Sequence, residues 1–314
     1  VLGSVRYKNL DVTKTHFGRH ELLFRIAAGG MAEVYAARVR GEGGFQKLVA
    51  VKRMLPGLSD DDRFVTMFLD EGRIAANISS PYVVSTLDLG RAEDDSLFLV
   101  MELVVGVSFR DLLQNLARAK RPMPIHIAVA ILSEAAQGLH DAHEATTPTG
   151  EALNIVHRDI SPHNIMVSVN GRAKITDFGV ARALQRLTQT FTGELKGKWA
   201  YFAPEQALAD QIDRRVDIFA LGIVAWETLT QRRLFYAESQ PQTIENVLTA
   251  RIPTVFETVQ GVPFELSEAV RKALQRDREL RYPTALDFAR ALTSAVRPAP
   301  ADEVSAFVRE HGGD

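Results

Sequence analysis

The spacing of apolar residues changes at Gly106 from a strand pattern to a helix pattern, and this change restricts the chain to few folds. Before Gly106, apolar residues at every second position predict strands at 21–28, 33–40, 47–54, 83–90 and 97–103. Residues 61–78 interrupt these strands with apolar residues at helical spacing. After Gly106 the pattern predicts helices at 108–119, 125–144, 214–231, 242–249, 265–276 and 283–295, with short strands at 154–156, 165–169 and 173–176. This order predicts an α+β fold, in which a small antiparallel sheet with one helix precedes a larger, mainly helical part.

Composition and charge remove several classes of function. The chain has 314 residues, 46% of them hydrophobic and 24% charged, which is ordinary for a globular protein. Its formal net charge of −2 gives no electrostatic reason to expect nucleic acid as a partner. The absence of cysteine excludes a disulfide framework and a thiolate metal site, and is typical of a reducing compartment.

Two apolar segments are the best candidates for a membrane span, but neither has the length or composition of one. IAVAILSEAAQGL and VDIFALGIVAW are short, and they carry Glu134 and Asp217. The N-terminus lacks the apolar region of a signal peptide. We therefore expect a cytoplasmic chain without membrane contact, while a longer parent chain could carry an anchor or a sensor domain.

A turn rich in small residues, IAAGGMAEVY, lies between two predicted strands. Without a Cβ in the way, backbone N–H groups in such a turn can approach a phosphate. A plain glycine-containing hairpin explains the turn equally well when it is considered alone. Because a strand follows, the turn is not a dinucleotide-binding fingerprint, which a helix would follow.

Lys52 and Glu71 predict a buried ion pair. The period of two places Lys52 on the same strand face as the small residue Ala50. Glu71 lies within an apolar helical stripe, formed by Phe64, Phe68, Ala75 and Ile78. A buried carboxylate costs several kcal/mol unless it is paired. Lys52 could instead be solvated at a strand edge, and Glu71 could lie at the border of the stripe, but pairing explains both positions together.

The segments HRDISPHN (157–164) and TDFG (176–179) contain three side chains suited to phosphoryl transfer. Asn164 and Asp177 offer hard oxygen ligands of the kind that Mg²⁺ prefers. Asp159 is then free to orient a hydroxyl group and accept its proton. Each acid alone could be a turn residue or a helix cap, but their occurrence in this order favours a catalytic site.

Together these segments resemble the eukaryotic-like protein kinase family, and particularly its bacterial serine/threonine branch. The resemblance covers roughly residues 18–295 and implies the bilobal protein-kinase fold. It divides the chain into an N-terminal extension at 1–17, in which vector-derived residues are an option, and a kinase domain at 18–296 followed by a tail at 297–314. Within the domain it implies an N-lobe at 18–102, a hinge at 102–106 and a C-lobe at 107–296.

The resemblance also implies ATP and Mg²⁺ as cofactors, with Mn²⁺ as an alternative, and protein substrates with Ser or Thr hydroxyls. In this template Lys52 holds the α- and β-phosphates and pairs with Glu71, Asp159 is the catalytic base, and Asn164 and Asp177 bind the metal. The template places the nucleotide against Ala27, Gly29, Gly30, Val34, Ala50, Met101, Glu102, Val104 and Met166. Met101 is then the gatekeeper, and Glu102 and Val104 offer backbone groups to adenine.

Four further positions match supporting residues of the family. The resemblance implies that HRDISPHN (157–164) is the catalytic loop, that Asp217 accepts hydrogen bonds from its backbone, and that Glu205 of AYFAPE pairs with Arg281. This pair argues against a kinase of small hydroxylated molecules. Arg158 resembles an arginine that binds a phosphate on the activation segment, where we predict autophosphorylation. The candidate threonines are Thr188, Thr190 and Thr192, with an unmodified threonine-rich loop as the alternative.

Two departures from the family pattern bear on activity. The glycine-rich loop has Ala27 and Ala32 in its outer positions, which are small enough to leave it usable. Ser161 stands where the serine/threonine branch has a lysine, and Lys198 stands where it has a threonine. We hypothesise that Lys198 supplies the charge that Ser161 cannot. The alternative is a solvated Lys198 in a slow enzyme.

The interpretation with most support is an active protein kinase. Its main rival is a pseudokinase scaffold that binds nucleotide without efficient transfer, favoured by Ser161 and the altered glycine-rich loop. The sequence names neither the protein substrate nor the upstream signal, and it leaves open a regulatory partner or a dimer.

Overall fold

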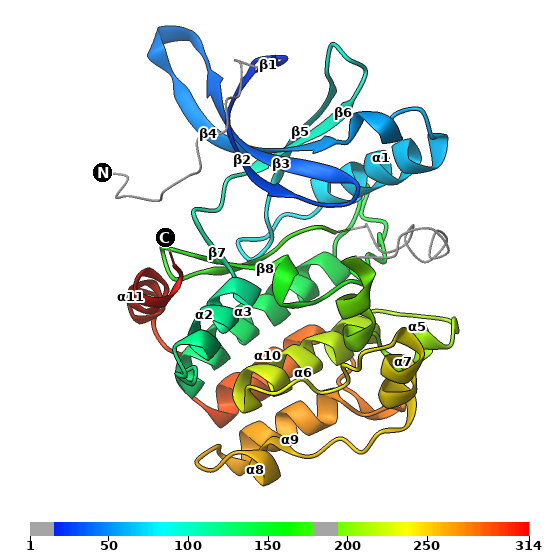
Figure 1. Ribbon diagram of the computed structural model, residues 1–314, viewed down its shortest axis with the longest axis vertical. Coiled ribbons are helices and arrows are strands. Elements are labelled where there is room, and N and C mark those ends of the chain that lie inside the picture. Colours follow the sequence, from blue (N-terminus) through cyan, green and yellow to red (C-terminus); the bar gives the residue numbers. More distant parts are fainter. Residues whose placement is uncertain (1–15, 179–193, 314) are drawn as a thin grey trace. The chain divides into compact units, whose positions relative to one another are not determined.

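The computed structural model describes residues 16–178 and 194–313, and it divides into two compact units (Figure 1). The N-terminal unit comprises the described residues up to Ile78 together with Val84–Val104. The C-terminal unit comprises Ser79–Val83 and Val105–Gly313. The first is mainly sheet and the second mainly helix, so the predicted α+β class is confirmed.

An antiparallel sheet of six strands forms the N-terminal unit, with the spatial order β1-β2-β3-β4-β6-β5. Its strands are β1 (His16–Phe17), β2 (His20–Ala28), β3 (Ala32–Arg40), β4 (Gln46–Met54), β5 (Thr86–Arg91) and β6 (Leu97–Glu102). Helix α1 (Asp62–Ala76) and the 3₁₀ turns η1 (Glu42–Gly44) and η2 (Pro56–Leu58) complete the unit.

Helix α1 packs closely on this sheet because Gly72 faces it. A Cβ at Gly72 would lie 3.1 Å from the side chain of Leu99 and 3.4 Å from that of Leu89. The helix begins at the cap residue Asp61, whose side chain accepts a hydrogen bond from the N–H of Arg63. The close packing buries Glu71 next to Gly72 and directs its carboxylate toward the strands.

The C-terminal unit has a three-stranded antiparallel sheet in the order β7-β8-β9, and helices α2, α3 and α11 pack against it (Figure 1). The strands are β7 (Gly106–Ser108), β8 (Ile165–Ser168) and β9 (Ala173–Ile175). The helices are α2 (Phe109–Arg118), α3 (Ile125–His143), α5 (Pro204–Ala207), α6 (Arg215–Thr230), α7 (Gln240–Thr249), α8 (Val255–Thr258), α9 (Phe264–Ala273), α10 (Ala285–Ala295) and α11 (Ala301–His311). The 3₁₀ segments are η3 (Pro162–Asn164), η4 (Glu194–Tyr201) and η5 (Arg278–Leu280).

Helix α6 forms the centre of this unit. Every residue from Val216 to Thr230 is buried, and the helix packs against α3, α9 and α10. This explains why the sequence of α6 is apolar nearly all round, as expected of a helix that is enclosed on all sides. Within residues 16–178 and 194–313, no helix is long and apolar enough to cross a membrane.

The C-terminal segment differs from the tail that the sequence led us to expect. Residues 301–311 form α11, which lies against α2, α3 and β8 (red in Figure 1). Val304 and Val308, one helical turn apart, are buried. The hydroxyl of Ser305 donates to the carbonyl of Val169 at 2.6 Å. The Pro/Ala-rich stretch that suggested an exit is the connection to this helix, with Pro300 at its cap, where a proline costs no helical hydrogen bond.

One predicted strand is wrong. Residues 154–156 have no regular structure, although Ile155 is buried. Asn154 has a φ of +48°, outside the range of a strand. The apolar residues of this short segment therefore reflect burial rather than strand pairing.

Candidate active site

In the N-terminal unit the site centres on an ion pair. Lys52 lies on β4, opposite Val34 of β3 and Leu99 of β6. Its Nζ is 2.6 Å from Oε1 of Glu71 on α1, and the two side chains are 11% and 6% exposed. Such burial is tolerated when the charges compensate each other and are hydrogen-bonded. The pair therefore holds the ammonium group in a defined position on the sheet.

The register of the sheet determines which side chains lie next to Lys52. Ala50 lies opposite Met101 of β6, and both are buried, while Val34 lies opposite Lys52. The N–H of Glu102 donates to the carbonyl of Ser85 at 2.9 Å, where β6 ends. These side chains form a small apolar surface on neighbouring strands, of the kind that suits an adenine ring.

The turn between β2 and β3 contains the predicted phosphate-binding residues. Ala27 is the second-last residue of β2. After the strand, the N–H of Gly29 donates to the carbonyl of Ala32 at 2.9 Å. Gly30 follows in the bend. The turn is thus closed by its own backbone, and of the three residues between the strands Gly29 and Gly30 have no side chain, while the third is Met31.

In the C-terminal unit the catalytic loop positions Asp159 and Asn164. The side-chain amide of Asn164 donates to the carbonyl of Asp159 at 2.7 Å, and both residues are only 8% exposed. Nζ of Lys198, from η4, lies 2.6 Å from Oδ2 of Asp159. The carboxylate that the sequence predicts as a base is therefore held by the loop and contacted by a cation.

The β8–β9 hairpin brings the two candidate metal ligands together. Asn164 directly precedes β8 and Asp177 comes two residues after the end of β9, and in this antiparallel pair Ile165 lies opposite Ile175. The N–H of Thr176 also donates to the carbonyl of Asn164 at 3.0 Å. The two side chains therefore come from the same end of the hairpin.

This donor set fits Mg²⁺ rather than a metal enclosed by protein. The amide nitrogen of Asn164 is directed to Asp159, which leaves its oxygen as the ligand atom. Among the described residues, no group of three His, Cys, Asp or Glu side chains gathers to hold a metal. Mg²⁺ is typically held by one or two protein oxygens, with water and substrate phosphates completing the shell.

His157 links the two loops, a role that the sequence reasoning missed. Its Nε2 donates to the carbonyl of Thr176 at 2.9 Å, and its Nδ1 accepts from the N–H of Asp159 at 3.3 Å. The ring also packs edge-on against Phe178, with centroids 4.6 Å apart. These bonds suit the neutral imidazole with its hydrogen on Nε2.

Asp217 of α6 anchors the catalytic loop from below. Its carboxylate accepts hydrogen bonds from the backbone N–H of His157 at 2.8 Å and of Arg158 at 2.7 Å. Nε2 of His143, at the end of α3, donates to it at 2.8 Å. Burial alone would raise the pKa of Asp217, but the bonds from His143 and the Arg158 N–H outweigh burial and lower it. Sequence reasoning missed His143, whose only signal was a histidine ending a helix that is apolar on most sides.

Comparison with known proteins agrees with this geometry. The family description "Protein kinase domain" matches residues 21–292. The chain belongs to the protein kinase family.

Three curated relatives cover most of this chain. It is 40% identical over 302 residues to the tyrosine-protein kinase MasK of Myxococcus xanthus, covering 95% of this chain and 47% of MasK. It is 35% identical to the serine/threonine-protein kinase PrkC of Bacillus subtilis, covering 86% and 39%. It is 34% identical to the serine/threonine-protein kinase PknL of Mycobacterium tuberculosis, covering 85% and 63%. The chain thus spans less than two thirds of the length of each relative.

A solved structure has the same fold. The PknI kinase domain of Mycobacterium tuberculosis superposes with a TM-score of 0.67 at 21% sequence identity, covering 90% of this chain and 98% of that one. At this identity the likeness supports the kinase fold alone.

A second buried ion pair in the C-terminal unit joins Glu205 and Arg281. Arg281 donates to both oxygens of Glu205, at 2.6 and 2.8 Å, and its side chain is fully buried. Its guanidinium also donates to three backbone carbonyls, those of Gln275, Arg215 and Arg276. With this many partners the pair joins α5 to the segment after α9 as a structural connection.

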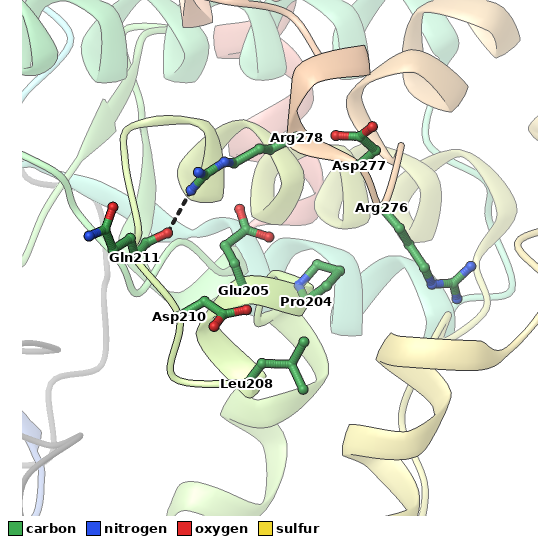
Figure 2. A pocket seen from close by; sticks show the side chains of 8 residues that line it. All are labelled: Pro204, Glu205, Leu208, Asp210, Gln211, Arg276, Asp277 and Arg278. Atoms are coloured by element: carbon green, nitrogen blue, oxygen red, sulfur yellow. Dashed lines mark hydrogen bonds between the residues drawn. The ribbon is translucent and has the colours of Figure 1, made fainter.

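Glu205 also lines a hollow of about 420 Å³ (Figure 2). Arg278 closes one side by donating to the carbonyl of Gln211, as the dashed line shows. Arg276, on another side, donates to the carbonyls of Val247, Asn246 and Ala250. Because these groups bind the protein's own backbone, the hollow is part of the packing around the Glu205–Arg281 pair.

The Ser161 and Lys198 positions differ from each other in their surroundings. The hydroxyl of Ser161 is buried and has no hydrogen-bond partner in the described part of the chain. The side chain of Lys198 is 33% exposed and contacts Asp159. A buried hydroxyl without a partner costs free energy, and this one lies within the segment 157–164, directly before η3.

The remaining predicted site residues lie in different parts of the chain. Met166 lies on β8 in the C-terminal unit, and Val104 ends the N-terminal unit. The predicted phosphorylation sites Thr188, Thr190 and Thr192 lie outside the described residues.

We expect Asp217→Asn to lower the free energy of unfolding by about 3–5 kcal/mol at pH 7, because it removes the charge from a buried group whose donors are all arranged for it. The folded-state pKa of Asp217 lies below its ordinary value of 3.8. Its stabilisation is therefore present above that value and is lost as the pH falls through the lowered pKa. Urea unfolding of wild type and variant should give a constant difference from about pH 7 to pH 5, which shrinks below about pH 4.

The exposed variant Asp302→Asn serves as the matched control, and its unfolding should differ little from wild type at any of these pH values. A difference between wild type and Asp217→Asn that grows as the solution is acidified would contradict the lowered pKa.

Proposed function

We propose that this chain is an active, ATP- and Mg²⁺-dependent protein kinase that transfers the γ-phosphate to serine or threonine hydroxyls. The observation that carries the proposal is the arrangement of Asp159, Asn164 and Asp177 at one end of the β8–β9 hairpin, with Asp159 fixed by Asn164. A pseudokinase has no need to keep a base and two metal ligands in this arrangement.

Each residue has a distinct part in the proposed reaction. Lys52, held by Glu71, binds the α- and β-phosphates. Asn164 and Asp177 would hold the metal, which neutralises phosphate charge when Mg·ATP is bound. Asp159 orients the acceptor hydroxyl and accepts its proton as the oxygen attacks the γ-phosphorus. Most of the rate enhancement then comes from positioning and electrostatics.

The relatives differ in acceptor, so the acceptor hydroxyl is a separate part of the proposal. PrkC and PknL are named serine/threonine-protein kinases, and MasK a tyrosine-protein kinase. The serine/threonine assignment is the one the resemblance of the whole catalytic set supports, and tyrosine is the second candidate. Three peptides that differ only in a Ser, Thr or Tyr acceptor separate the two.

The first test is transfer of the γ-phosphate to such peptides by wild type and by Asp159→Asn. We expect the variant to lose roughly 10²- to 10⁴-fold in kcat, because it removes the proton acceptor. Binding of Mg·ATP, measured by calorimetry, should change only slightly, since Asp159 is not assigned to the nucleotide. Wild-type transfer no faster than that of the variant, with nucleotide binding intact, would instead establish the pseudokinase.

The contact between Lys198 and Asp159 supports the hypothesis that Lys198 supplies a cation at the transfer site. We expect Lys198→Met to lower kcat by roughly 10²- to 10³-fold, because a fixed charge near the developing negative charge is removed. Lys198→Arg should keep part of the rate. Lys47→Met, on an exposed residue of β4, is the control. Turnover of a peptide by Lys198→Met at the wild-type rate would sink the hypothesis.

We further propose autophosphorylation of the activation segment at Thr188, Thr190 or Thr192, with Arg158 as the phosphate-binding residue. After incubation with Mg·ATP, intact-mass analysis should detect at least one added phosphate on wild type and none on Asp159→Asn. The triple variant with alanine at the three threonines should gain less. The idea fails if wild type turns over a peptide but gains no phosphate itself.

A further inference from the structure

In the C-terminal unit, three cationic side chains lie next to the catalytic loop or next to η4. They are Arg110, Lys198 and Arg233. We call them the basic rim. They come from the first turn of α2, from η4 and from the connection after α6. Of the three, only Lys198 has a part in the proposed transfer.

Arg110 lies beside the catalytic loop. Its Nη1 contacts Nε2 of His163 at 2.6 Å, and His163 is the neighbour of Asn164 in η3. Burial lowers the pKa of His163, and the nearby charges of Arg110 and Lys198 lower it further. Arg110 therefore borders the same loop whose Asp159 is contacted by Lys198.

Arg233 packs against the end of η4. Its guanidinium covers the ring of Tyr201 at 5.3 Å and that of Tyr236 at 5.4 Å from their centroids. Tyr201 is three residues after Lys198 in η4. Burial and the carboxylate of Glu227 raise the pKa of Tyr201, while the charges of Arg233 and Arg110 both oppose this rise. Arg110 and Arg233 thus act on the same hydroxyl from different elements.

The negative groups near the rim leave its charge only partly compensated. Glu227 is buried and forms an ion pair with Arg233, with Nε and Oε1 3.3 Å apart; it also accepts hydrogen bonds from the hydroxyl of Tyr201 and the N–H of Leu234. Burial raises the pKa of Glu227. Asp111 accepts from the hydroxyl of Ser108. In residues 16–178 and 194–313, Arg110 has no carboxylate within ion-pair distance. Its side chain is solvent-exposed, and that of Arg233 is 49% exposed.

We propose that the basic rim selects acceptor segments that carry Asp or Glu beside the phosphorylated hydroxyl. This inference rests on the proposed function, because the acceptor hydroxyl must reach Asp159, and Lys198 of η4 contacts that carboxylate. An extended acceptor chain advances about 3.3 Å per residue, so the residues on either side of the hydroxyl pass along η4. Carboxylates there meet cations that the protein itself leaves partly uncompensated, while a lysine or arginine would be repelled.

The test uses one acceptor peptide in four forms, with glutamate, glutamine, lysine or phosphoserine at the positions flanking the hydroxyl. We expect the glutamate form to have the highest kcat/KM, mainly through a lower KM. Arg110→Gln and Arg233→Gln should each reduce the ratio of glutamate to glutamine peptide by roughly two- to five-fold. The ratio should also fall at high salt, because exposed charges are screened. Arg118→Gln, on an exposed residue of the same helix α2, should leave the ratio unchanged.

A binding measurement makes the inference independent of turnover. Labelled peptides with alanine in place of the acceptor bind without transfer, and fluorescence anisotropy should give the same order of affinity. Equal binding of the glutamate and glutamine forms, or a ratio unaffected in both arginine variants, would overturn the proposal. A preference for phosphoserine without any preference for glutamate would also overturn it, in favour of an acceptor that is already phosphorylated. If binding shows the preference but no peptide is phosphorylated, the rim is upheld and the proposed function fails.

Discussion

The catalytic half of this kinase depends on one buried carboxylate. Asp217 lies within a helix that is enclosed on all sides, where an unpaired charge would cost several kcal/mol. Three donors compensate it, and two of them are backbone N–H groups of the catalytic loop. These bonds hold Arg158 at a φ of +67°, a conformation that a side-chain-bearing residue adopts only when its surroundings enforce it. The unfavourable burial of this carboxylate is therefore compensated by hydrogen bonds that also hold the loop in a defined conformation.

Further hydrogen bonds connect the loop that Asp217 holds to its neighbouring segments. The loop carbonyl of Arg158 accepts from Gln206, beside Glu205, and the ring of His157 binds the carbonyl of Thr176, next to Asp177. The Glu205–Arg281 pair then joins this region to the segment after α9. Compared with these enclosed groups, Lys198 is one third exposed, so its ion pair with Asp159 is the more accessible to solvent.

Much of the fold was predictable because periodicity reports burial locally. The alternation in 47–54 placed Lys52 on a strand, and the stripe in 61–78 placed Glu71 on the buried face of α1, where the two now meet at 2.6 Å. Residues 154–156 and 301–311 were predicted less well. In the first, burial occurs without strand pairing, and in the second, a proline-rich connection precedes a helix whose apolar face is only two valines wide.

Short motifs and local periods were sufficient to predict the family, the order of the motif segments and the chemical type of each candidate residue from the sequence. The packing of distant segments brings His143 to Asp217 across 74 positions, Lys198 to Asp159 across 39, and Arg110 to His163 across 53. No local pattern encodes such contacts, since they arise where separate helices and loops pack together. Ser161 and Lys198 were visible in the sequence as two unusual residues, but their surroundings, a buried hydroxyl at one and a contact with Asp159 at the other, depend on folding.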